Sequence, residues 1–185
     1  MDASRARGFT LIELVIFIVL VGIAFGGLML AISQFTKTSA DPLIDKQALA
    51  IAESLLDEIE LMPFTTCDPD DANAATGVGC TTLESIGPEG GQGEDRWSST
   101  SPFDNVNDYH GFQMLTGIKP IYDATTAITG LGNYKASVTV AAANLGGITS
   151  GSGNVLRITV TVTKPDNTTI SLDGFRARYA PTTAQ

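Results

Sequence analysis

Histidine and cysteine are nearly absent from this sequence of 185 residues, which contains one His and two Cys. One imidazole cannot supply the ligands of a typical catalytic zinc site. His110 could act as a general base, or pair with a cysteine nucleophile, only if Cys67 and Cys80 are not bonded to each other. We interpret His110 as a polar loop residue, and we predict neither catalytic nor metal-binding residues.

The sequence signatures of enzymes are missing too. The chain has no G-x-S-x-G nucleophile elbow, no H-E-x-x-H zinc motif, no Walker loop and no dinucleotide-binding fingerprint. No internal repeat is visible. We therefore expect that the protein is not an enzyme and that it requires no cofactor.

Basic residues are few, because 11 Lys and Arg stand against 20 Asp and Glu, for a net charge of −9. Binding to a phosphate backbone needs a basic patch, so we do not expect nucleic acid as a partner. The imbalance is steepest in residues 68–108, where Arg96 is the single basic residue. We interpret this segment as a solvated loop surface. Its nine carboxylates are Asp68, Asp70, Asp71, Glu84, Glu89, Glu94, Asp95, Asp104 and Asp108.

One long apolar run stands out from this polar background. Leu14 to Ile32 is nineteen residues without a charge, close to the roughly 20 that cross a hydrocarbon core of about 30 Å as a helix. Thirteen of the nineteen are Leu, Ile, Phe or Val, which together favour insertion by about 4–8 kcal/mol. The sequence predicts a transmembrane helix. Arg5 and Arg7 before it indicate a cytoplasmic N-terminus and an extracytoplasmic C-terminus.

A cleavable secretory signal fits this run poorly. The run is longer than the roughly 7–15 apolar residues of such a signal, and no small-residue cleavage site follows it. A plain signal anchor is a further alternative. It gives no reason for Glu13 at the head of the run, where an acidic side chain costs up to about 3 kcal/mol at the centre of a span.

The residues around Glu13 resemble a known processing motif. The run GFTLIE, Gly8 to Glu13, is similar to the prepilin cleavage and methylation motif of type IV pilins and type II secretion pseudopilins. In that motif a Phe follows the cleaved Gly, and a Glu is the fifth residue of the mature chain. The resemblance covers about the first 25 residues. It implies that prepilin peptidase cuts between Gly8 and Phe9 and methylates the new amino group of Phe9.

The same resemblance gives Glu13 a role in filament assembly, in which it pairs with the Phe9 ammonium of a neighbouring subunit. Two opposite charges about 4 Å apart attract by about 4 kcal/mol at an effective dielectric near 20, which offsets the cost of placing Glu13 among apolar helices. The expected partners are other pilin subunits through the N-terminal helix, prepilin peptidase and the inner-membrane assembly platform.

Two later stretches carry a second resemblance. AESLLDEI, residues 52–59, is followed by Pro63-Phe64 and later by FDNVNDYHG, residues 103–111. Together they are similar to the minor pilin D type of mannose-sensitive haemagglutinin (MSHA) pili. Related pseudopilins carry a stretch like the first. The resemblance implies a minor pilin that supports surface adhesion. The alternatives are a pseudopilin of a type II secretion system and a membrane-anchored periplasmic hydrolase or binding protein.

Cys67 and Cys80 lie in the part of the chain expected outside the cytoplasm, where thiols are oxidised. They close a loop of about 14 residues, for which a disulfide contributes roughly 3 kcal/mol. Their spacing does not fit a C-x-x-C redox site, so we predict a Cys67–Cys80 disulfide. The loop begins with Asp68-Pro-Asp70-Asp71 but lacks the Gly and Glu that an EF-hand needs at its sixth and twelfth positions. We do not predict a calcium loop here.

Periodicity predicts how the rest of the chain folds. Apolar residues spaced by three or four continue to Ile59, so one helix is expected from Phe9 to Met62, with a kink or restart at Asp41-Pro42. Residues 63–112 are rich in Gly and are expected to be irregular. Strict alternation predicts strands within residues 134–140 and 156–162, and a turn at 164–168 leads into a third.

The third strand changes its phase, since Ile170 and Leu172 alternate in one register and Phe175, Ala177 and Tyr179 in the other. We expect a bulge at residues 173–174 to reset it. The predicted fold class is α+β, with a long N-terminal helix packed on a small antiparallel sheet of three or four strands. The expected parts are a leader (1–8), a transmembrane or filament-core helix (9–33), its amphipathic continuation (34–62) and a periplasmic head (63–185) with an irregular region (63–112) and a sheet (134–180). Before assembly, the protein is expected to span the inner membrane once.

Overall fold

The computed structural model describes residues 10–89 and 93–178, without the side chains of residues 34–41. Gly8, Phe9 and Tyr179 therefore lie outside the described residues. The chain divides into two compact units, residues 1–44 and residues 45–185. We describe each unit by itself.

The helix α1 (Leu11–Glu60) contributes to both units. It begins after Thr10, whose carbonyl accepts the N–H groups of Glu13 and Leu14 at 3.1 and 3.2 Å. Pro42 lies inside the helix, so the restart expected at Asp41-Pro42 is absent. A proline removes one hydrogen bond from the helical ladder, and the turns before and after residue 42 remain helical despite that loss.

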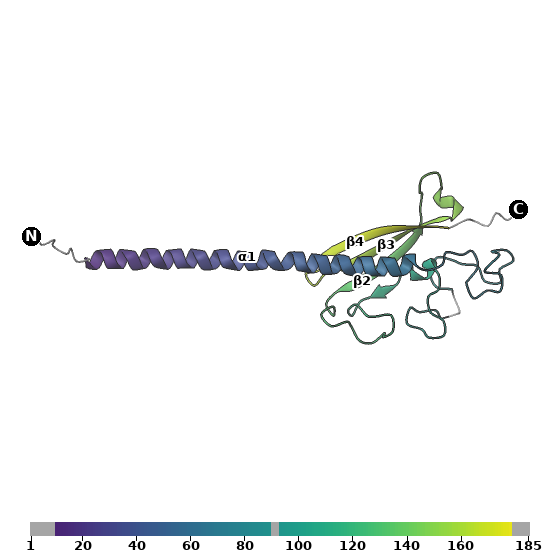
Figure 1. The fold of residues 1–185 in the computed structure, drawn as a ribbon, viewed down its shortest axis with the longest axis horizontal. Helices are drawn as coiled ribbons and strands as arrows, with labels where there is room; N and C mark the ends of the chain where they lie inside the picture. The colour runs from purple at the N-terminus through teal and green to yellow at the C-terminus, as the bar shows by residue number, and fades with distance from the viewer. Residues whose placement is uncertain (1–9, 90–92, 179–185) are drawn as a thin grey trace, which may run out of the picture. The chain divides into compact units, whose positions relative to one another are not determined.

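The second unit contains a four-stranded antiparallel sheet in the order β1-β2-β3-β4 (Figure 1). The strands are β1 (Gln113–Met114), β2 (Lys135–Ala142), β3 (Val155–Thr163) and β4 (Thr169–Ala177). The predicted alternation is observed, since every second residue of β2 from Ala136 to Val140 and of β3 from Leu156 to Val162 is buried. Two short 3-10 helices, η1 (Val106–Tyr109) and η2 (Ser150–Ser152), lie between the longer elements.

The prediction of a bulge at residues 173–174 in β4 is wrong. Residues 169–177 pair with residues 155–163 of β3 in one unbroken register, with Gly174 opposite Ile158. Gly174 keeps the inward phase of Ile170 and Leu172, whereas Phe175 is 44% exposed and belongs to the outward phase. A glycine inside a strand marks either a bulge or a close approach of another element, and here it is the second. A Cβ on Gly174 would meet the Glu60 carboxylate and, at 2.8 Å, Leu56 Cδ1.

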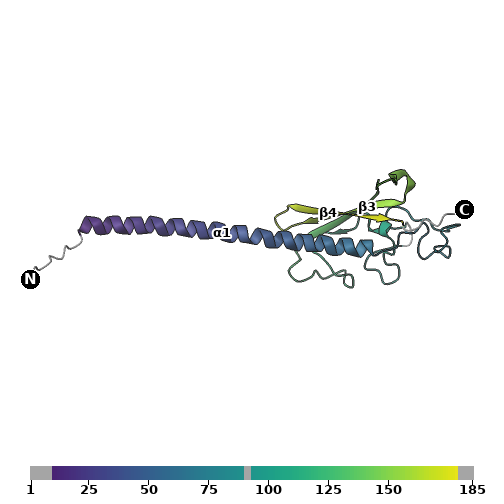
Figure 2. The ribbon, with the colours of Figure 1, turned by 45° about the horizontal axis from the view of Figure 1, so that its top comes forward.

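The core of the second unit lies between the sheet and the last four turns of α1, which run along one sheet face (Figure 2). Tyr134, directly before β2, donates its hydroxyl hydrogen to Gln47 Oε1 at 2.8 Å, which links the helix to the start of this strand. The fold is therefore α+β, as predicted. The helix residues buried against the sheet are Ala48, Ile51, Ala52, Leu55, Leu56 and Ile59.

Candidate functional site

The N-terminal part of α1 is apolar on all sides. Leu11–Ser33 is, by length and composition, long and apolar enough to cross a membrane, and none of it is buried within the protein. A helix that is hydrophobic all round belongs in a membrane or in the core of an assembly. The first unit therefore presents a surface that water does not solvate well.

Glu13 lies in the first turn of this helix. Its backbone N–H donates to Thr10 Oγ1 at 3.3 Å, which is one half of a capping box of the Thr-x-x-Glu type. A negative charge in the first turn also interacts favourably with the helix dipole, by about 0.3–1 kcal/mol. Glu13 thus has a local role at the helix start, which sequence reasoning missed although the Thr10-x-x-Glu13 spacing would have indicated it.

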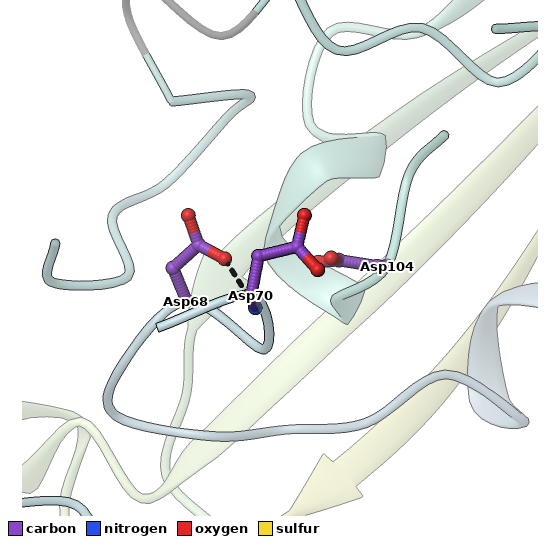
Figure 3. Close-up of side chains that lie close together, drawn as sticks. All are labelled: Asp68, Asp70 and Asp104. Atoms are coloured by element: carbon purple, nitrogen blue, oxygen red, sulfur yellow. Dashed lines mark hydrogen bonds between the residues drawn. The ribbon is translucent and has the colours of Figure 1, made fainter. Parts of the chain in front are cut away.

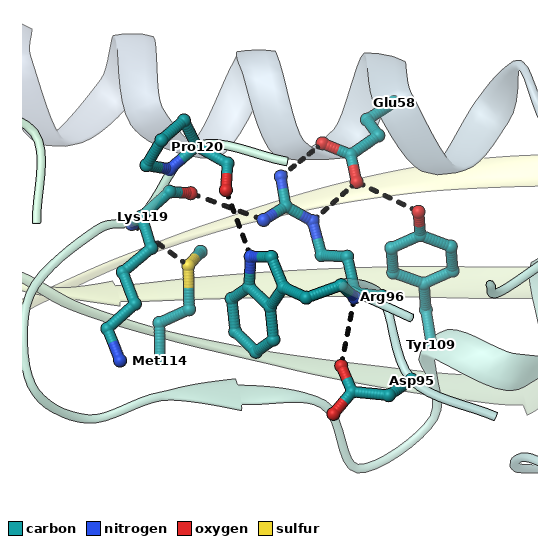
Figure 4. Close-up of polar contacts among 8 residues, drawn as sticks. Glu58, Asp95, Arg96, Tyr109, Met114, Lys119 and Pro120 are labelled. Carbon is teal, nitrogen blue, oxygen red and sulfur yellow. Dashed lines mark hydrogen bonds and ion pairs between the residues drawn. The ribbon is translucent and has the colours of Figure 1, made fainter. Parts of the chain in front are cut away.

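In the second unit, the loops are held to α1 by Arg96, which is 7% exposed. Its Nε and one terminal nitrogen donate to the two carboxylate oxygens of Glu58, both at 2.6 Å (Figure 4). Its other terminal nitrogen donates to the Lys119 carbonyl at 3.2 Å. The Tyr109 hydroxyl donates to Glu58 Oε1 at 2.8 Å, and burial beside Glu58 raises the pKa of Tyr109.

Aromatic side chains surround the Arg96 guanidinium. It lies 5.5 Å from the ring centre of Trp97 and 5.7 Å from that of Phe112, distances at which a cation is attracted to the ring face. Trp97 in turn donates its indole N–H to the Pro120 carbonyl at 2.9 Å. One arginine therefore connects α1, η1 and the segments around residues 96 and 119. The sequence did not predict the pairing of Arg96 with Glu58, because the two residues are 38 positions apart and no local pattern connects them.

The loop after α1 is closed by a disulfide between Cys67 and Cys80, whose Cα atoms are 5.4 Å apart. Asp71 organises the loop by accepting the N–H groups of Asn73, Thr81 and Thr82 at 2.8, 2.6 and 2.9 Å. The bond from Asn73 is the main cause of the lowered pKa of Asp71. This carboxylate is thus a structural acceptor.

Two groups of three carboxylates lie close together among the described residues. In the first, Asp68, Asp70 and Asp104 each offer an oxygen within 4.8 Å of the others (Figure 3). Asp68 is 2% exposed, and its Oδ1 accepts the Asp70 N–H at 2.7 Å. Desolvation, followed by repulsion from Asp68 and Asp70, raises the pKa of Asp104 to about 6.

The second group is Glu84, Glu89 and Asp108, again with one oxygen each within 4.8 Å of the others. Desolvation, followed by repulsion from Glu89 and Asp108, raises the pKa of Glu84 to about 9. Desolvation also raises the pKa of Asp108 to about 7. Glu94 lies beside the group, because its Oε2 accepts the Glu89 N–H at 3.4 Å, and desolvation raises its pKa to about 8. The sequence predicted that these carboxylates form a solvated surface. That prediction is wrong for the buried ones among them, Glu89 and Asp108.

His110 has a structural bond. Its Nδ1 accepts the N–H of Val140 in β2 at 3.2 Å, and the ring is exposed. The neighbouring Gly111 N–H donates to the Val138 carbonyl at 3.1 Å. The segment after η1 is thereby attached to the edge of β2, which accounts for a histidine at this position without catalysis.

Comparison with known families identifies a motif at the start of the chain. Residues 3–29 match the model of the prokaryotic N-terminal methylation motif, which is typical of type IV pilin-like prepilins. No curated protein and no solved structure matches the chain. The match includes Gly8, Phe9 and Glu13 and covers the start of the apolar helix.

Proposed function

We propose that the protein is a structural minor pilin of a type IV, MSHA-like pilus. Prepilin peptidase cleaves it between Gly8 and Phe9 and methylates Phe9, and the mature chain then joins the filament or primes its assembly. The observation that carries this proposal is the N-terminal methylation motif at residues 3–29, which leads into a helix that is apolar and exposed on all sides.

The exposed helix gives the proposal a physical basis. An apolar surface of this kind is stable in a bilayer before assembly and among the helices of other pilin subunits after it. The protein would span the inner membrane once, with residues 9–33 as the anchor and residues 63–185 as a periplasmic head. Residues 1–8 would be the leader, and residues 34–62 would join the anchor to the head.

Glu13 has two candidate roles, and they differ in what they require. Pairing with the Phe9 ammonium of a neighbouring subunit requires a negative charge. The cap at the helix start requires only the backbone N–H of residue 13, which donates to Thr10 Oγ1 and which both glutamine and alanine keep. Glu13→Gln and Glu13→Ala therefore both remove the charge and keep this cap.

The test is incorporation into fibres in the native host. We expect Glu13→Gln and Glu13→Ala to be cleaved and stable but missing from sheared pili, because a lone ammonium among apolar helices costs about 3–5 kcal/mol. Glu53→Gln, an exposed glutamate on the same helix, is the matched control and should be incorporated. Normal incorporation of Glu13→Gln would refute the pairing role.

Processing is tested separately. Intact-mass analysis of the native protein should show a chain that begins at a methylated Phe9. Gly8→Val should yield uncut precursor, because a side chain there would crowd the peptidase. A native chain that still begins at Met1 would remove the basis of the pilin proposal.

The MSHA assignment rests on the similarity of residues 52–59 and 103–111, and a type II secretion pseudopilin shares the N-terminal motif. Deletion of the gene distinguishes the two proteins. Loss or reduction of surface pili with normal secretion supports the minor pilin, whereas accumulation of exoproteins in the periplasm supports the pseudopilin.

A further inference from the structure

The group formed by Glu84, Glu89 and Asp108 brings three carboxylates together with no ion pair to any of them among the described residues. Asp108 is fully buried and Glu89 is 8% exposed, and one oxygen from each of the three lies within 4.8 Å of the others. The three arrive from different places: Glu84 is fixed by its N–H bond to the Thr66 carbonyl at 3.0 Å, and Asp108 belongs to η1. The arrangement depends on the tertiary fold.

Three oxygens of this group lack donors, whereas Glu89 Oε1 accepts the Ser85 N–H at 3.2 Å. Both carboxylate oxygens of Glu84 and Oδ1 of Asp108 are inaccessible to water and accept no hydrogen bond of good geometry among the described residues, although the side chains of Glu89 and Asn105 lie against Glu84. The other Asp108 oxygen accepts the N–H groups of Asp104 and Asn105 at 3.0 and 2.8 Å. Buried polar atoms in native proteins are nearly always satisfied, so these three atoms indicate a missing ligand.

No side chain in the described part of the protein supplies the cation. Arg96, the single basic residue of segment 68–108, is committed to Glu58. Arg178 is attracted by the Glu84 charge without forming an ion pair with it. Its hydrogen bonds go to the Thr66 hydroxyl and the Thr65 carbonyl at 2.9 and 3.1 Å, and its guanidinium lies over the ring of Phe64. Among described residues, no Lys, Arg or His nitrogen lies within 4.0 Å of the carboxylate oxygens of Glu84, Glu89 or Asp108.

We propose that Glu84, Glu89 and Asp108 bind a calcium ion in the head. Calcium takes six to eight oxygen ligands at about 2.3–2.6 Å, so two ligands on opposite sides of the ion are about 4.8 Å apart. Three carboxylate oxygens that lie within 4.8 Å of one another can therefore all contact one ion of this size. Magnesium prefers octahedral geometry at about 2.0–2.1 Å and retains its waters, so it suits this buried group less. The proposal is independent of the proposed function.

The neighbouring group of Asp68, Asp70 and Asp104 serves as the internal control. Its buried member, Asp68, already has a donor in the Asp70 N–H, and no oxygen of the three is both inaccessible and unpartnered. Nothing there calls for an ion. Asp70→Asn therefore replaces one carboxyl of the acidic region with an amide, as Glu84→Gln does, while leaving the proposed ligands in place.

The experiment uses the full chain, purified in detergent micelles and freed of metal by chelator. Calorimetric titration with CaCl₂ should give one site with a Kd of about 10⁻⁴–10⁻³ M, the range of extracellular calcium modules. Calcium should also raise the Tm of the head, and the same concentration of MgCl₂ should raise it less. Glu84→Gln should abolish the calcium-dependent Tm shift, and Asp70→Asn should retain it.

A second measurement tests whether Glu84→Gln loses the calcium response only because the substitution destabilises the fold. Without calcium, Glu84→Gln should melt at or above the wild-type temperature, because an amide is always neutral and supplies a donor to the neighbouring carboxylates. Three outcomes would overturn the proposal: no calcium-dependent shift in the wild type, an equal shift in Glu84→Gln, or equal effects of calcium and magnesium. The last two would indicate general screening of acidic charge, and the first a proton shared between Glu84 and Glu89.

Discussion

Replacing Arg96 with methionine tests the main tertiary link of the head. The variant keeps an unbranched side chain of similar length and removes the charge, which leaves the Glu58 carboxylate with the Tyr109 hydroxyl as its remaining donor. The Lys119 carbonyl also loses its donor. We expect the head to lose stability because a charge that was paired on folding becomes unpaired.

The magnitude follows from burial. The side chains of Arg96 and Glu58 are 6% and 20% exposed, so the pair is largely but not wholly removed from water. Breaking a buried pair costs about 3–5 kcal/mol, and the partial exposure of Glu58 favours the lower end. A loss of about 3 kcal/mol corresponds to a decrease in Tm of roughly 10 °C for a head of this size.

The assay is thermal unfolding of the full chain in micelles, followed by circular dichroism. Arg157→Met is the matched control, because Arg157 is exposed on β3 and should tolerate the change within about 0.5 kcal/mol. A double-mutant cycle with Glu58→Gln should give a coupling energy of at least about 1 kcal/mol. If Arg96→Met melts like Arg157→Met, or if the coupling is zero, the ion pair does not hold the loops to α1.

Two further substitutions test the packing and the disulfide of the head. Gly174→Val should cost about 1–3 kcal/mol because its Cβ would enter the space of Leu56 and Glu60, and Gly147→Val, in an exposed turn with open space around it, should cost little in the same thermal melts. Replacing both Cys67 and Cys80 with serine should cost roughly 3 kcal/mol under non-reducing conditions. Unchanged melting of that double variant, or two free thiols in peptide maps of the native protein, would contradict the disulfide.

The sequence predicted the elements whose residues repeat with a regular period. The apolar stripe from Ile44 to Ile59 and the alternation in β2 and β3 are local patterns, and both correspond to observed elements. Gly174 was misread because a strand glycine fits two explanations, a bulge or a close approach, and only the position of Leu56 distinguishes them. Of the kink or restart expected at Asp41-Pro42, the restart was wrong, since the surrounding turns continue the helix.

The side-chain contacts within the head could not be predicted from local sequence patterns. Arg96 and Glu58 are 38 residues apart, and the intervening region 63–112 has no period from which their proximity could be derived. The same holds for Glu84 and Asp108, which looked like parts of one solvated surface because sequence reports charge and not burial. By contrast, residues 3–29 were informative because the N-terminal methylation motif is a pattern of consecutive residues that needs no tertiary contact to be found.

The uniform surface of Leu11–Ser33 has a consequence for how such helices can pack together. A helix that is equally apolar on every side has nearly the same contact energy with its neighbours at any rotation about its axis and at many axial offsets. Apolar contacts alone therefore specify neither the rotation of such a helix nor its axial position relative to its neighbours. Glu13 is the one charged residue of this segment, so it makes one axial position differ in energy from the others. Apolar area would then determine how strongly neighbouring helices bind one another, while one carboxylate would determine their axial register.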